Sequence, residues 1–152
     1  MPSLRRIPAD DQAALAQLPA LYRAARALAM PWLPVLHTPE EDRAFFTQKI
    51  TEWQSCWGAF EADRLLGYIA FDEKWVHHLY VAPEAQRRRI GSALMDKALE
   101  DGLPKKLFVF EQNEGARRFY ENHGFAALAF SDGSENEEKT PDVLYAWGRA
   151  EG

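Results

Sequence analysis

The chain has 152 residues, 47% of them hydrophobic, a size and composition that suit a single domain over residues 1–152 with its own core. Its net charge of −5 and the lack of any apolar run of ~18 residues exclude broad binding to nucleic acid or to a membrane. The one cysteine, Cys56, excludes an intramolecular disulfide and a metal site of several cysteines, so we expect a cytoplasmic protein without metal, nucleic-acid or membrane partners.

The first third of the chain is predicted to be mainly helical. A short strand is expected at residues 3–8, followed by an alanine- and leucine-rich helix at residues 10–30 that Pro19 kinks or splits. A second helix is expected at residues 36–50. The segment TPEE at residues 38–41 predicts its start, because it combines a capping threonine, a proline at the first helical position and a glutamate three residues after the cap.

The middle of the chain consists of short segments rich in aromatic and β-branched residues. Three consecutive antiparallel strands are expected at residues 53–62, 64–73 and 75–82, because charged turn residues separate these segments. Pro83 ends the third strand. Apolar residues then recur at helical spacing, which predicts a helix over residues 90–100.

The last third alternates strands with one further helix. A strand is expected at residues 103–112, and Asn113 caps a helix that Gly124 ends in the left-handed conformation. Two final strands at residues 126–130 and 142–147 flank a charged loop. The mixed order predicts an α/β (α+β) domain with a mixed, mostly antiparallel central sheet flanked by about four helices.

Three consecutive arginines lead into the helix that begins near residue 90, in the stretch QRRRIGSALM. A helix start exposes unpaired N–H groups and carries roughly half a positive charge, so arginines there are unfavourable unless an anion also binds. Gly91 and Ser92 are small enough for a phosphate to approach the backbone. This stretch by itself leaves two interpretations open, a polyphosphate site and an exposed basic turn that pairs with acidic residues.

The arginine stretch and the later segment NEGARRFYENHGF together resemble two linked motifs of the GNAT superfamily of acetyl-CoA-dependent N-acetyltransferases. The resemblance is good over residues 53–130 and looser at both ends. It implies a single GNAT-like domain that uses acetyl-CoA as its co-substrate. The residues that match the pattern are Gln86, Gly91, Asn113, Ala116, Phe119, Tyr120, Gly124 and Phe125.

The resemblance also implies which residues hold the cofactor. Backbone groups of Leu79, Tyr80 and Val81 would bind the pantetheine arm, with Asn113 beside it. The pyrophosphate would be held by the loop that contains Gln86, Arg87, Arg88, Arg89, Ile90, Gly91 and Ser92.

Arg89 departs from the family pattern, because it stands where the first glycine of the loop is usual. A left-handed backbone at that position would cost an arginine about 1 kcal/mol or more. The alternative is a position that needs only a slim residue, from which the arginine side chain swings out to contact phosphate. We favour the second interpretation.

Acetyl transfer needs a neutral amine, stabilisation of the oxyanion and a proton for the leaving thiolate. By the resemblance, Tyr120 supplies that proton, since a phenol with a pKa of about 10 is protonated at neutral pH. His77 and His78 are candidates for the general base, and they point to opposite faces of their strand. We take His78 as the candidate, with Glu111 or a water chain as alternatives.

The acceptor is expected to be a primary amine of a small molecule or a peptide. Residues 37–41 and the acidic loop at residues 131–142 are candidates for its binding site, and several tryptophans line a pocket or pack in the core. Two other functions stay open: an acyl-CoA sensor without turnover, and a nucleic-acid-binding domain, which the acidic balance disfavours. The protein is expected to be a monomer or a homodimer.

Overall fold

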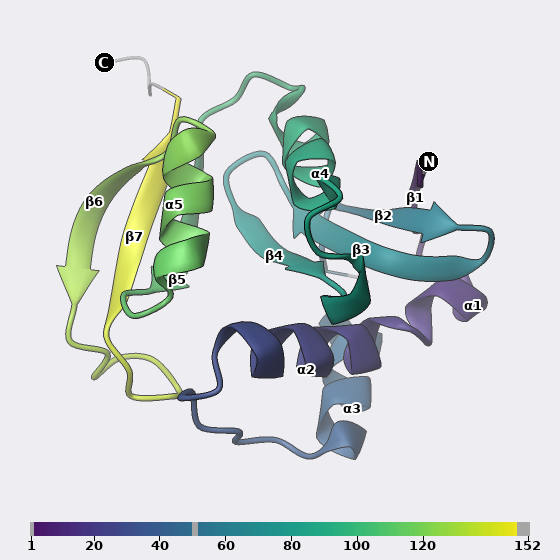
Figure 1. Ribbon diagram of the computed structural model, residues 1–152, viewed down its shortest axis with the longest axis horizontal. Helices are drawn as coiled ribbons and strands as arrows, with labels where there is room; N and C mark the ends of the chain where they lie inside the picture. The colour runs from purple at the N-terminus through teal and green to yellow at the C-terminus, as the bar shows by residue number, and fades with distance from the viewer. Residues whose placement is uncertain (1, 50–51, 149–152) are drawn as a thin grey trace.

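The computed structural model of the chain describes residues 2–49 and 52–148, and it has the mixed α/β architecture that the sequence predicts (Figure 1). Residue 50, where the second predicted helix ends, lies outside the described residues. The elements follow in the order β1 Ser3–Arg6, α1 Gln12–Leu15, α2 Leu18–Ala29, α3 Pro39–Lys49, β2 Ser55–Glu61, β3 Arg64–Phe71, β4 Val76–Val81, the short 3-10 helix η1 Pro83–Ala85, α4 Ile90–Leu99, β5 Lys105–Phe110, α5 Glu114–Asn122, β6 Ala126–Ser131 and β7 Asp142–Trp147.

The strands form two antiparallel sheets where one central sheet was expected. The first sheet has the order β1-β2-β3-β4 and the second has the order β5-β7-β6. Within the described residues, β4 and β5 meet through a single parallel bridge between Trp75 and Lys106 and then separate. The expectation of one sheet was therefore wrong in this respect, because hydrophobic alternation predicts which face of a strand is buried but not which edges pair.

Lys105 anchors the end at which the two sheets meet. Its side chain is completely buried, and its ammonium donates to the carbonyl oxygens of Asp72 at 3.0 Å and Glu73 at 3.3 Å. The same group pairs with the carboxylate of Asp101 at 2.8 Å. These contacts tie the start of β5 to the turn between β3 and β4, so the two strands diverge from a fixed point.

Helices cover both faces of the first sheet, with α2 on one side and α4 on the other (Figure 1). The first predicted helix is split, as expected: α1 ends at Leu15, and Pro19 lies in the first turn of α2, where its missing N–H costs little. The predicted capping box is confirmed, since the N–H of Thr38 donates to the Glu41 carboxylate at 2.8 Å and the N–H of Glu41 donates to the Thr38 hydroxyl at 3.1 Å.

Helix α5 covers one face of the second sheet, and both of its predicted ends are confirmed (Figure 1). The side chain of Asn113 accepts a hydrogen bond from the N–H of Ala116 at 3.3 Å. Gly124 follows the helix with a φ of 91°, the left-handed conformation that favours glycine. No helix among the described residues is long and apolar enough to cross a bilayer.

Candidate functional site

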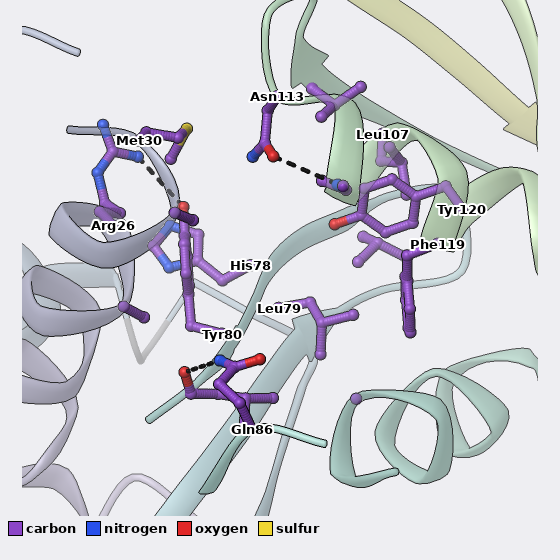
Figure 2. Close-up of a pocket in the computed structure, with 18 of the residues that line it drawn as sticks. Arg26, Met30, His78, Leu79, Tyr80, Gln86, Leu107, Asn113, Phe119 and Tyr120 are labelled. Atoms are coloured by element: carbon purple, nitrogen blue, oxygen red, sulfur yellow. Dashed lines mark hydrogen bonds between the residues drawn. The ribbon is translucent and has the colours of Figure 1, made fainter. Parts of the chain in front are cut away.

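A cavity of about 750 Å³ lies where β4 and β5 separate, between the end of α2 and the starts of α4 and α5 (Figure 2). The structure brings the predicted site residues together around this cavity, with the exception of Arg88, whose guanidinium pairs with Glu61 away from it. The predicted residues that line the cavity are His78, Leu79, Tyr80, Val81, Gln86, Arg87, Arg89, Ile90, Gly91, Ser92, Asn113 and Tyr120.

The N-terminus of α4 opens into this cavity without a side-chain cap. Arg89 precedes the helix and makes no capping hydrogen bond, while Gly91 lies close to the ring of Phe119. The first N–H groups of α4 are thus left for a ligand, with the positive end of the helix dipole behind them. Arg87 and Arg89 line the same part of the cavity, which makes it a site for an anion.

Arg89 adopts the left-handed conformation, with φ 60° and ψ 21°, so our preference for a merely slim position was wrong. Arg87 is also left-handed, with φ 64°. A left-handed backbone costs a residue with a Cβ roughly 1–2 kcal/mol. The chain therefore holds two strained arginines beside the helix start, and both residues line the cavity in spite of that cost.

Strand β4 has an open backbone edge toward the cavity. It pairs with β3 through Gly67–Val81, Tyr68–Tyr80 and Ile69–Leu79, and beyond Trp75 the described residues place no strand on its other side. Gln86 returns to this edge and donates from its side-chain amide to the carbonyl of Val81 at 2.9 Å (Figure 2). An extended ligand can pair with the remaining backbone groups as an added strand would.

The Tyr120 hydroxyl points into the cavity from α5 (Figure 2). Burial raises the pKa of this phenol above its ordinary value, and the nearby Tyr80 adds to the effect. The phenol is therefore fully protonated at neutral pH and is able to donate its proton.

His78 lies on the opposite wall, in a cluster of aromatic rings between β4 and helices α2 and α3. Its ring stacks on Tyr22 with centroids 5.3 Å apart, contacts Trp53 at 4.9 Å, and shares a hydrogen bond of 2.9 Å between its Nδ1 and the Tyr68 hydroxyl. Burial lowers the pKa of His78 to about 3, and the positive charge of Arg26 adds to the effect. The imidazole is thus neutral at pH 7 and takes up a proton only weakly.

The two other candidates for the base differ in their relation to the cavity. His77 lines it as well, and its ring is hydrogen-bonded to Asp72 at 2.8 Å. Glu111 is exposed and does not line the cavity. The tryptophans have both of the positions that the sequence left open. Trp53 packs against the core, whereas Trp32 contacts the ring of Phe110 at the cavity wall.

Arg26 is a residue of the site that the sequence reasoning missed. Its guanidinium lines the cavity, donates to the Tyr80 hydroxyl at 3.2 Å and pairs with the Glu138 carboxylate at 3.2 Å (Figure 2). An arginine within an alanine-rich helix has no local signal that marks it as functional. Its partners lie 54 and 112 residues away in the sequence.

The two segments expected to form the acceptor site meet each other next to Arg26, but neither of them lines the cavity. The connection between β6 and β7 reaches the segment between α2 and α3 (Figure 1), where Glu137 is hydrogen-bonded to His37. The Glu138–Arg26 pair adds a second link one residue further on. Arg26 is therefore the residue through which these segments contact the cavity wall.

The fold and the cleft bring an open strand edge, an uncapped helix start and a tyrosine hydroxyl together in one cavity. The chain belongs to the acetyltransferase (GNAT) family, whose model matches residues 22–125.

Similar proteins agree with this assignment. The chain is 30% identical over 92 residues to the peptidyl-lysine N-acetyltransferase YiaC of Escherichia coli, a match that spans 60% of this chain but only 62% of YiaC. Two solved structures share the fold. The PaiA N-acetyltransferase of Thermoplasma acidophilum, in complex with coenzyme A, superposes with a TM-score of 0.69 at 18% identity, and the match covers 98% of this chain and 99% of that one. The structure of yncA from Salmonella typhimurium with acetyl-CoA superposes with a TM-score of 0.73 at 15% identity, and the match covers 100% of this chain and 96% of that one.

Proposed function

We propose that this protein transfers the acetyl group of acetyl-CoA to a primary amine of a small molecule or a peptide by direct attack of the amine on the thioester. The observation that carries the proposal is the cavity itself, which joins the uncapped start of α4 to the Tyr120 hydroxyl. Relatives with the same fold hold coenzyme A or acetyl-CoA.

The residues that line the cavity fit this co-substrate. The open edge of β4 at Leu79 and Tyr80 suits the amide-containing pantetheine arm, which pairs with backbone groups. The N–H groups at Ile90, Gly91 and Ser92 suit the pyrophosphate. Asn113, whose side-chain oxygen already caps α5, lies at the wall between the arm and the reaction site.

In the proposed reaction, acetyl-CoA supplies the acetyl group and the side chains of this chain handle the protons. Acetyl-CoA supplies a carbonyl carbon to which the amine nitrogen bonds while the bond to sulfur breaks. Tyr120 donates its proton to the departing sulfur, and the proton lost by the amine restores the phenol through solvent. With a pKa of about 3, His78 is a weak base, so its part in the proposal is to shape the wall opposite Tyr120.

The weak basicity of His78 favours amines that lose a proton easily. At pH 7 a lysine side chain must be deprotonated at a cost of roughly 4.6 kcal/mol, whereas the α-amine of a peptide costs only about 1 kcal/mol. The test of the proposed function is thiol release from acetyl-CoA in the presence of amino acids, polyamines, aminoglycosides and short peptides. Release above the hydrolysis rate with one class supports the proposal. Binding of coenzyme A with silence across the panel would favour the sensor.

The three arginines are expected to contribute unequally to coenzyme A binding. Replacement of Arg87 or Arg89 by alanine should weaken binding about three- to tenfold at low salt, because each removes a cation that faces the cavity. Arg88→Ala is the matched control, since Arg88 pairs with Glu61 outside the cavity, and its effect should be smaller. Equal losses in all three variants, measured by calorimetry, would contradict the placement of the phosphates at α4.

A further inference from the structure

Arg26 places a positive charge at the acceptor end of the cavity. It comes from the last turn of α2, and its side chain is largely buried, with 19% of its surface exposed. Figure 2 shows its guanidinium beside the Tyr80 hydroxyl, across the cavity from Tyr120. Glu138 offsets part of this charge, and the remainder acts on any ionised group that enters the site.

The contacts of Arg26 fix its guanidinium without using all of its donors. A guanidinium has five N–H groups, and the structure pairs one nitrogen with Tyr80 and another with Glu138. The group also lies over the ring of Tyr22, 4.9 Å from its centroid. Glu138 does not line the cavity, and the two contacts use two of the five N–H groups, so the guanidinium keeps donors for a ligand.

The charged side chains around the cavity are mostly cationic. Arg26, Arg87 and Arg89 line it, and Glu114 is the one carboxylate that the described residues place there. The two other arginines lie at the start of α4, where the proposed function has them pair with phosphates. Arg26 is separate from these two arginines and lies across the cavity from Tyr120. A second cation such as a polyamine is disfavoured beside it, whereas a carboxylate forms a charge-assisted hydrogen bond with it.

We propose that the acceptor is a free α-amino acid whose carboxylate binds Arg26 and whose amine faces the thioester. This inference rests on the proposed function. Pairing with Arg26 also helps the reaction. The negative carboxylate of a free amino acid raises the pKa of the neighbouring amine, and the guanidinium offsets that negative charge, so more of the amine is neutral and able to attack.

The experiment compares amino acids with their carboxamides, which keep the amine and the side chain but lack the negative charge. The unmodified protein should acetylate the acid with a kcat/KM, counted per neutral amine, at least about tenfold above that of the amide. Counting per neutral amine is needed because the carboxamide holds the ammonium form less strongly than the carboxylate does. Arg26→Gln should bring the ratio of the two close to one, and Arg26→Lys should keep part of the preference because it keeps the charge. Arg23→Gln is the matched control: Arg23 lies one turn earlier on α2, pairs with Asp42 outside the cavity, and its variant should keep the ratio.

Three outcomes would overturn the inference. An amide acetylated as well as its acid by the unmodified protein would exclude a carboxylate subsite. An unchanged ratio in a folded Arg26→Gln variant would exclude Arg26 as its anchor. Acetylation of lysine-containing peptides in preference to free amino acids would support the proposed function and refute the inference alone, whereas no acetylation of any amine would refute both.

Discussion

Replacement of Tyr120 by phenylalanine is expected to lower kcat about 10²- to 10⁴-fold, the usual contribution of a general acid. The phenylalanine ring keeps the packing of Tyr120 against Phe119 and Phe125, so the variant removes little besides the proton donor. The affinity for coenzyme A should stay within about twofold, because under the proposed function the hydroxyl acts on the leaving sulfur only in the transition state. Steady-state thiol release and calorimetry measure the two quantities separately.

Tyr145→Phe is the control for this experiment. Tyr145 is fully buried behind Tyr120, and its hydroxyl donates to Glu121 at 2.7 Å and accepts from Arg117 at 3.0 Å, outside the cavity. Its loss should lower stability but leave kcat nearly unchanged. If Tyr120→Phe kept its kcat within about twofold while Tyr145→Phe behaved as expected, the proton would have to come from another donor.

Replacement of Lys105 by methionine is expected to lower the free energy of unfolding by about 2–4 kcal/mol. The change leaves the carbonyl groups of Asp72 and Glu73 and the carboxylate of Asp101 without their shared donor. The expected loss lies toward the lower part of the range for broken buried pairs, because the Asp101 side chain is 35% exposed and water compensates part of it. Urea unfolding measures the change.

Lys106→Met is the matched control, because Lys106 is the next residue on β5 and its side chain is exposed. Its effect should stay within about 0.5 kcal/mol. A similar stability for both variants would mean that the buried ammonium does not hold the two sheets together. A loss of stability in Lys105→Met accompanied by weaker coenzyme A binding would tie the same contact to the shape of the cleft.

Much of the fold follows from local patterns in the sequence. The capping box at Thr38, the cap at Asn113 and the left-handed Gly124 each depend on a few neighbouring residues, and all three are as predicted. The separation of β4 from β5 depends instead on the long-range anchor at Lys105, which no periodicity indicates. Lys105 and Lys106 stand side by side at the start of β5, and only the fold shows that the first is buried and the second exposed.

The site likewise has features that local sequence patterns predict and features that only long-range contacts produce. Most residues of the two linked motifs line one cavity, because they belong to elements that follow one another in the chain, whereas Gly124 and Phe125 lie outside it. The weak basicity of His78 comes from Tyr22 and Trp53, which no spacing rule places beside it. The left-handed backbone of Arg89 is likewise a property of the folded loop, since an arginine at that position is equally compatible with other conformations.

The contact between the β6–β7 connection and α2 has a consequence for how this scaffold diverges. The residues proposed to hold coenzyme A lie in one continuous stretch between β4 and α5, whereas Arg26, His37 and Glu138 come from segments on either side of it. Under the proposed function, mutations that exchange the flanking segments are therefore expected to alter the acceptor without rebuilding the cofactor cleft. Evolution or a protein engineer would then be free to change the choice of amine in those two segments while the acetyl donor stays the same.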